Sequence, residues 1–153
     1  LTFDRLLNEE MLLAVPTGHP LLQDPGTDIA LDALKDERFI LVRRPGAPGM
    51  YANLIKACQN GGFEPKIAFE VERMLTNLSL VAAGEGISVV PASMRDVHRE
   101  SVVYCRIKDA RPKLLAPITL VRRTFNPSAP LQNFIGLARE LAGVYRKQAL
   151  NPH

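Results

Sequence analysis

Short apolar runs, each bounded by glycine, proline or charged residues, recur along the chain and are typical of buried strands. They lie at residues 12–15, 39–42, 67–71, 87–90, 102–107 and 118–122. Three further stretches place apolar residues at helical spacing, and Gly61 and Gly62 end the first of them. These stripes are Tyr51, Leu54, Ile55 and Cys58; Leu75, Leu78, Val81 and Ala82; and Leu131, Phe134, Ile135, Ala138, Leu141 and Tyr145. The alternation of strands with helices predicts an α/β fold with a mostly parallel sheet.

The positions of Gly84 and Gly86 indicate whether residues 81–94 form a nucleotide-binding turn or the end of a helix. In a dinucleotide fold such glycines follow a strand and open a helix. Here a helical stripe precedes Gly84, and the β-branched residues Ile87, Val89 and Val90 follow Gly86. The glycines are therefore predicted to end a helix, with Gly84 or Gly86 in the left-handed conformation, and not to bind a nucleotide.

Composition places the chain in the ordinary globular class. It has 153 residues, of which 46% are hydrophobic and 23% charged, which suits one domain or two small lobes. The formal net charge of +3 comes from scattered Lys and Arg residues, so it favours a solvated basic surface over nucleic-acid binding. Cys58 and Cys105 are far apart and lack any metal-ligand spacing, so no disulfide, metal or cofactor is expected.

Targeting signals are missing from the sequence. No apolar stretch approaches the ~20 residues that span a bilayer, and the N-terminus lacks the pattern of a signal peptide. The cysteine usage favours a reducing compartment, so we expect a cytoplasmic protein without a membrane partner. The chain begins with Leu1 and enters an apolar pattern almost at once, which suggests a fragment whose earlier part is missing.

Two proline-rich joints, at residues 16–20 and 112–117, interrupt the regular pattern. The residues between them suffice for one small compact lobe. We therefore expect residues 1–16 to end one lobe and cross to the next, residues 17–115 to form a second lobe, and residues 116–153 to return to the first. Two crossing segments imply a hinge and a cleft.

An ordered series of short segments covers nearly the whole chain and resembles the effector-binding domain of LysR-type transcriptional regulators. The segments are LLAVPTGHPL at 12–21, FIL at 39–41, Cys58 with GFEP at 62–65, MLT at 74–76, VAAGEGISVVPAS at 81–93, Val103 with Tyr104, and LVRR at 120–123. Each segment is weak alone, but the series is specific. Within the family the chain is similar to members that regulate the breakdown of aromatic compounds.

The resemblance implies a type 2 periplasmic-binding-protein-like fold: two Rossmann-like lobes joined by two crossover segments, with the first lobe incomplete in this chain. A small anionic inducer, with aromatic acids among the candidates, would bind in the cleft between lobes. The resemblance also implies DNA binding through an N-terminal winged helix-turn-helix that is absent here, a homodimer or homotetramer, and RNA polymerase as a further partner. A periplasmic-type solute-binding protein of the same fold is the alternative.

Ligands of open α/β sheets bind beyond the carboxyl ends of strands, at helix N-termini that favour anions. The first such place follows the strand at 39–42, where Arg43, Arg44, Gly46 and Gly49 lead into a helix. Glycines allow close backbone approach, and an Arg guanidinium can grip a carboxylate. We expect Arg43 or Arg44 to contact the anion; alternatively both are solvated and the loop is only a turn.

The second place follows the strand at 67–71. Met74 is expected to supply an apolar wall and Thr76 a hydroxyl for the ligand, although Thr76 could cap the helix and Met74 could belong to the core. Pro91, at the end of the strand at 87–90, is a third candidate for the cleft.

Catalysis is not expected. His19 lies in a Pro/Gly loop, His98 in a charged stretch and His153 at the terminus, so none has an evident nucleophile as partner. Ser93 lacks the Gly-x-Ser-x-Gly setting of a hydrolase nucleophile. An enzyme on the same fold would convert its ligand to a product, and no residue of this sequence requires such an activity.

Overall fold

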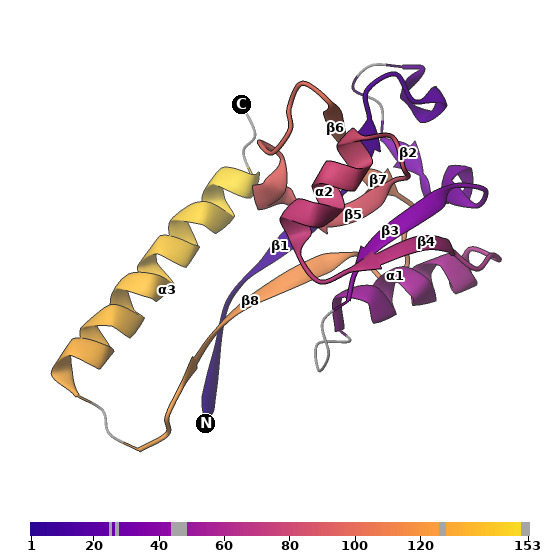
Figure 1. The fold of residues 1–153 in the computed structure, drawn as a ribbon. Helices are drawn as coiled ribbons and strands as arrows, with labels where there is room; N and C mark the ends of the chain where they lie inside the picture. Colours follow the sequence, from indigo (N-terminus) through magenta and orange to yellow (C-terminus); the bar gives the residue numbers. More distant parts are fainter. Residues whose placement is uncertain (25, 27, 44–48, 126–127, 151–153) are drawn as a thin grey trace. The chain divides into compact units, whose positions relative to one another are not determined.

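The computed structural model describes residues 1–24, 26, 28–43, 49–125 and 128–150, and excludes the side chains of residues 49, 50, 149 and 150. The chain divides into two compact units. Unit 1 comprises Leu1–Glu9 and Pro117–His153, and unit 2 comprises Glu10–Ala116. Two strands, β1 (Thr2–Pro16) and β8 (Leu115–Arg122), contribute residues to both units and pair with each other (Figure 1).

In unit 2, β1 lies between β5 (Ser88–Pro91) and β6 (Val102–Cys105) and is antiparallel to both. Leu13 has Val89 as its partner on one side and Cys105 on the other. The prediction of a mostly parallel sheet is therefore wrong for β1. β1 runs without a break from unit 1 into unit 2, and there it lies antiparallel between β5 and β6.

The other strands of unit 2 are parallel to their neighbours. β3 (Arg38–Val42) pairs with β4 (Lys66–Val71), and β2 (Ile29–Ala30) pairs with β7 (Ile107–Lys108). Ile87 joins β3 to the start of β5, because its backbone accepts from Ile40 and donates to Arg38, both at 2.8 Å. The carboxyl ends of β4, β3 and β5 therefore lie along one edge, as Figure 1 shows.

The helices are α1 (Gly49–Asn60), α2 (Met74–Ala82) and α3 (Ala129–Leu150), and they confirm the three predicted stripes. The described chain also contains the short 3-10 helices η1 (Pro20–Leu22), η2 (Leu31–Leu34) and η3 (Ala92–Met94). No helix of the described chain is both long and apolar enough to cross a membrane. Cys58 and Cys105 are free thiols.

The core of unit 2 has two sides because neighbouring residues of a strand point to opposite faces. Leu13 and Leu41 belong to a cluster that includes Leu54 and Cys58 of α1. Ala14 and Ile40, their neighbours in sequence, belong to a second cluster that includes Leu78 and Val81 of α2. Thus α1 and α2 cover opposite faces of the sheet.

Gly84 and Gly86 are glycines for different reasons. Gly84 has φ +82° and closes α2 in the left-handed conformation, which decides the predicted choice between the two. Gly86 instead lies against β3, and a Cβ there would stand 2.4 Å from the Arg38 carbonyl oxygen. The close approach that Gly86 allows is the one that joins β3 to the start of β5.

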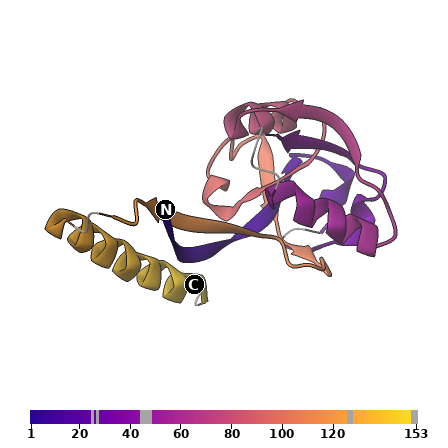
Figure 2. The same cartoon turned by 90° about the horizontal axis from the view of Figure 1, so that it is seen from below.

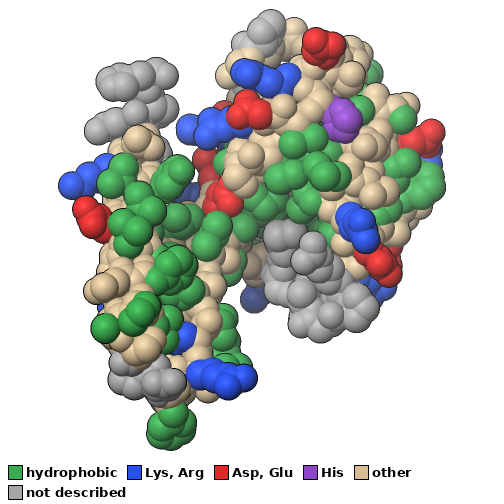
Figure 3. Space-filling view, turned by 60° about the vertical axis from the view of Figure 1, so that its left-hand side comes forward, with side chains coloured by type: hydrophobic (Ala, Val, Ile, Leu, Met, Phe, Trp, Pro, Cys, Tyr) green, Lys and Arg blue, Asp and Glu red, His purple; other side chains and the backbone are tan. Residues whose placement is uncertain are grey.

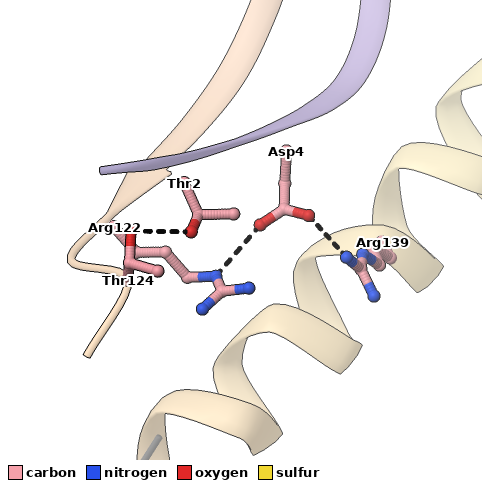
Figure 4. A network of polar contacts seen from close by, with 5 residues as sticks. All are labelled: Thr2, Asp4, Arg122, Thr124 and Arg139. Atoms are coloured by element: carbon pink, nitrogen blue, oxygen red, sulfur yellow. Dashed lines mark hydrogen bonds and ion pairs between the residues drawn. The ribbon is translucent and has the colours of Figure 1, made fainter. Parts of the chain in front are cut away.

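Unit 1 consists of the first part of β1, the last part of β8 and α3. Figures 1 and 2 show α3 as one continuous helix. Asp4 of β1 connects these three elements: its carboxylate pairs with Arg122 of β8 at 3.1 Å and with Arg139 of α3 at 2.5 Å (Figure 4). The two guanidinium hydrogen bonds, that of Arg139 first, lower the pKa of Asp4 from its ordinary value.

Candidate functional site

The carboxyl edge of unit 2 carries most of the predicted binding residues. The Arg43 N–H donates to the Val71 carbonyl at 2.8 Å, so the loop after β3 starts beside the end of β4. Met74 opens α2 three residues after Val71, and Pro91 ends the adjacent β5. The fold thus places Arg43, Met74 and Pro91 at one edge, as expected for loops that follow parallel strands.

Arg43 is exposed and already carries a partner. Its Nη1 lies 2.9 Å and 3.2 Å from the two carboxylate oxygens of Glu70, the penultimate residue of β4. The side chains are 73% and 40% exposed, so the pair is a surface ion pair worth at most about 1 kcal/mol. A ligand carboxylate could replace Glu70 at little cost, since an exposed guanidinium keeps free donors.

The loop after Arg43 contains two predicted site residues, Arg44 and Gly46, which lie outside the described residues. Gly49 begins α1. Just inside α1, the Tyr51 hydroxyl accepts a hydrogen bond from the Val42 N–H, and so ties the helix start to the end of β3. Burial, together with the negative charge of Glu70, raises the pKa of Tyr51 to about 12. The phenol is therefore neutral near pH 7 and can act as a hydrogen-bonding group.

Tyr51 also lines a small pocket within unit 2 that the sequence did not reveal. Its other lining residues are Met11, Asn53, Leu54, Val89, Leu114 and Leu115. Met11 is the strand partner of Pro91, so the pocket begins beside the predicted site residue at the end of β5. The sequence signal for this pocket was the pair Tyr51 and Asn53, a phenol and an amide in the first turns of a helix that follows a strand.

At the start of α2, the second predicted binding region, Met74 and Thr76 differ in environment. Met74 is half-buried and packs against the cluster under α2, whereas Thr76 is exposed. The residue that caps α2 is Arg73, and its side chain makes no capping hydrogen bond. The first N–H groups of a helix have no intrahelical acceptor, so this end of α2 offers donors, with the Thr76 hydroxyl nearby in sequence.

Asn77 and Ser88 are the two buried polar residues of the described chain. The Asn77 side-chain amide donates to the Ile40 carbonyl at 2.9 Å, and the Ser88 hydroxyl donates to the same oxygen at 2.8 Å. Together they fix α2 and β5 against the middle of β3. The sequence did not predict this network. Asn77 is next to the predicted Thr76 but lies on the inner face of α2, and its partner Ile40 is 37 residues away.

One serine and one histidine do meet in unit 2. Ser79 Oγ lies 3.2 Å from His98 Nε2, and the same hydroxyl donates to the Leu75 carbonyl at 2.9 Å. The Ser79 hydroxyl donates to the Leu75 carbonyl of its own helix, so its proton is not directed at His98. A nucleophile would instead donate that proton to the base, so the contact fits a structural role.

Comparison with known families identifies the class of protein. The family described as "LysR substrate binding domain" matches residues 1–143. The chain therefore belongs to the LysR substrate-binding domain family, as its sequence resemblance predicted. It has the mixed α/β, type 2 periplasmic-binding-protein-like fold of LysR effector-binding domains, in agreement with the predicted fold class.

Individual relatives are transcriptional regulators. The chain is 31% identical over 136 residues to the HTH-type transcriptional regulator BenM of Acinetobacter baylyi, covering 89% of this chain and 44% of BenM. It is 31% identical over 145 residues to the regulator TfdS of Cupriavidus pinatubonensis, covering 94% and 47%. The chain thus spans about half the length of these relatives. They support an effector-sensing domain over the alternative solute-binding protein, and they are regulators, not enzymes.

Solved structures agree with this assignment. The BenM effector-binding domain with its effector benzoate superposes with a TM-score of 0.78 at 28% identity, covering 99% of this chain and 66% of that one. Full-length BenM superposes with a TM-score of 0.76 at 28% identity, covering 94% and 47%. Both likenesses include nearly all of this chain, so the two units belong to one effector-binding domain.

Proposed function

We propose that this chain senses a small organic anion for a bacterial LysR-type transcriptional regulator, and that the anion binds at the carboxyl edge of unit 2 beside Arg43. The single observation that carries the proposal is the convergence of Arg43, the start of α2 and Pro91 on that edge. An exposed guanidinium next to a helix N-terminus favours a negative charge.

The proposed site assigns a different part to each residue. Arg43 pairs with the anionic group, assisted by Arg44 and by the backbone at Gly46 and Gly49. Half-buried Met74 and Pro91 supply apolar walls, and the Thr76 hydroxyl supplies a polar contact. In this scheme residues 17–115 are regulatory lobe II, and residues 1–16 and 116–153 belong to lobe I and the crossovers.

The inducer is proposed to be an aromatic or aliphatic carboxylate. Support comes from the charge of Arg43, from Met74 and Pro91 on the same edge, and from the benzoate bound by the effector-binding domain of BenM. A carboxylate would compete with Glu70 for Arg43, which makes that ion pair part of the binding equilibrium.

In the full-length protein, the proposed anion shifts the regulator between two states by its differential affinity for them. A coupling of about 1–3 kcal/mol suffices for an ordinary allosteric response. The regulator would act in the cytoplasm as a homodimer or homotetramer, bind DNA through a helix-turn-helix domain, and contact RNA polymerase.

Calorimetric titration with benzoate and a panel of dicarboxylates tests the proposed site, on the chain extended to the full effector-binding length. Arg43→Ala is expected to weaken binding about ten- to a hundredfold, because it removes a charge-assisted hydrogen bond worth about 1.5–3 kcal/mol. Glu70→Gln is expected to strengthen binding, because it removes the competing carboxylate. Thr76→Ala should weaken binding to a smaller degree.

Lys66→Ala provides the matched control. Lys66 pairs with Asp36 at 3.1 Å, is also exposed, and lies at the opposite, amino-terminal end of β4. It should leave the affinity unchanged. Equal affinity in Arg43→Ala and the unaltered domain would refute the assigned site, and consumption of the acid during titration would refute a purely sensory role.

A further inference from the structure

Tyr51, in the first turn of α1, carries a hydroxyl proton that has no acceptor among the residues that the structure describes. The Tyr51 oxygen accepts the Val42 N–H. A phenol hydroxyl has one proton to donate as well as lone pairs that accept, so this contact leaves the proton unused. Burial raises the pKa of Tyr51 to about 12, so the proton stays on the oxygen at neutral pH. Tyr51 is therefore a half-buried donor that is available to a ligand.

The Tyr51 donor lies on the side of the sheet where Arg43 holds its partner. Leu41 packs in one cluster with Leu54 of α1, so it points to the face that α1 covers. Glu70 is the register partner of Leu41, and register partners on neighbouring strands point to the same face. The negative charge of Glu70 also acts on the Tyr51 phenol. An acid that replaces Glu70 on Arg43 is therefore placed on the face from which Tyr51 donates.

The surroundings of Tyr51 are mostly apolar. Met11, Leu54 and Val89 line the same pocket and are 1% to 5% exposed, whereas Asn53, the other polar side chain of the lining, is exposed. Figure 3 shows that hydrophobic side chains also reach the surface of unit 2, between charged ones. Apolar contacts discriminate poorly between ligands of similar size, but a donor left unpaired disfavours a ligand that lacks an acceptor. The Tyr51 hydroxyl can therefore select among carboxylates.

Arg43 can hold both oxygens of a ligand carboxylate without help from Tyr51. Its Nη1 already lies within 3.2 Å of both carboxylate oxygens of Glu70. We infer that Tyr51 determines specificity, because its O–H donates to a second acceptor oxygen of the inducer, a ketone carbonyl or a second carboxylate. This inference rests on the proposed anion site beside Arg43, and it narrows the inducer to a carboxylate that carries a further oxygen.

Pairs of acids that differ only at the second oxygen test this assignment in the full-length protein. Phenylacetate has a CH2 group where phenylglyoxylate has a ketone beside the carboxylate, and 4-ethylbenzoate and 4-acetylbenzoate differ in the same way at the far end of the ring. Calorimetric titration measures the affinity of each acid with and without Tyr51→Phe. At least one ketone acid should bind more tightly than its partner, and Tyr51→Phe should reduce that preference about three- to tenfold, because one hydrogen bond is lost.

The difference within each pair separates ligand recognition from a structural role. Tyr51→Phe also removes the acceptor of the Val42 N–H, but that loss weakens both acids of a pair equally. Tyr104→Phe is the matched control, because the Tyr104 hydroxyl donates to the Val97 carbonyl at 2.6 Å, and it should leave the preference unchanged. A preference that is absent, or unchanged by Tyr51→Phe, would overturn the role of Tyr51 and leave the anion site standing. If none of the acids binds, the anion site itself fails, and this inference fails with it.

Discussion

Gly86 shows how one missing side chain can position a whole strand. A Cβ at this position would stand 2.4 Å from the Arg38 carbonyl oxygen, and that same oxygen accepts the Ile87 N–H at 2.8 Å. The close approach brings β5 into line with β3, and with it brings Pro91 to the edge that carries Arg43. A local steric requirement at Gly86 thereby contributes to the geometry of the proposed site.

Gly86→Ala is expected to lower the free energy of unfolding by about 2–3 kcal/mol, because the new methyl group forces the Arg38 carbonyl to move. Gly84→Ala is the control, since a Cβ there would meet nothing within 4 Å and only the φ of +82° is strained. That strain should cost about 1–2 kcal/mol. Urea denaturation followed by circular dichroism measures the free energy of unfolding of each variant. A Gly86→Ala effect no larger than that of Gly84→Ala would contradict the steric account.

Among the elements, α3 is attached to β1 in unit 1 through the Asp4 carboxylate, which pairs with Arg139. Asp4 lies between Arg122 and Arg139, and its pKa is lowered by them. A lowered pKa in the folded state means that the contribution to stability is fully present above the unfolded pKa, near 3.8, and is lost as the pH falls through the folded value.

Hydrogen exchange across α3, corrected for intrinsic rates, should therefore show protection that decreases as the pH falls below the ordinary Asp value. Asp4→Asn should reduce this protection at neutral pH and flatten its acid dependence. Asp96→Asn removes an exposed carboxylate that pairs with Arg99 in unit 2, and should leave α3 unchanged. If Asp4→Asn exchanges like the unaltered chain, Asp4 does not hold the helix.

For the whole molecule, the uneven distribution of buried residues predicts an order of unfolding. Unit 2 contains both hydrophobic clusters, with fully buried residues such as Phe39, Leu13 and Leu78. Unit 1 has few buried side chains and most of the exposed large hydrophobic ones among the described residues. Segments with few buried apolar contacts open at lower free energy than core strands.

Native-state hydrogen exchange of the 153-residue chain should thus show α3 exchanging at least tenfold faster than β3 and β5. Equal exchange in α3 and the core strands of this chain would mean that unit 1 is as stable as unit 2.

Particular residues show how far sequence reasoning reached. The stripe from Leu75 to Ala82 predicted α2, and Gly84 closes that helix as expected. The site residues were placed at strand ends by pattern, but the partner of Arg43 could not be foreseen. Glu70 lies 27 residues away, and only the parallel pairing of β3 with β4 brings the two together. The roles assigned to Arg43, Met74, Thr76 and Pro91 stay predictions.

The sequence by itself determined the three α-helices, most of the strands, the family and the edge at which the predicted binding residues lie, because periodicity and turn residues are local properties of a chain. Tertiary structure alone decided the antiparallel placement of β1, the shared acceptor of Asn77 and Ser88, the Asp4 contacts and the exposed face of α3. Each of these depends on residues far apart in sequence, whose proximity arises only when the strands pair and the side chains pack.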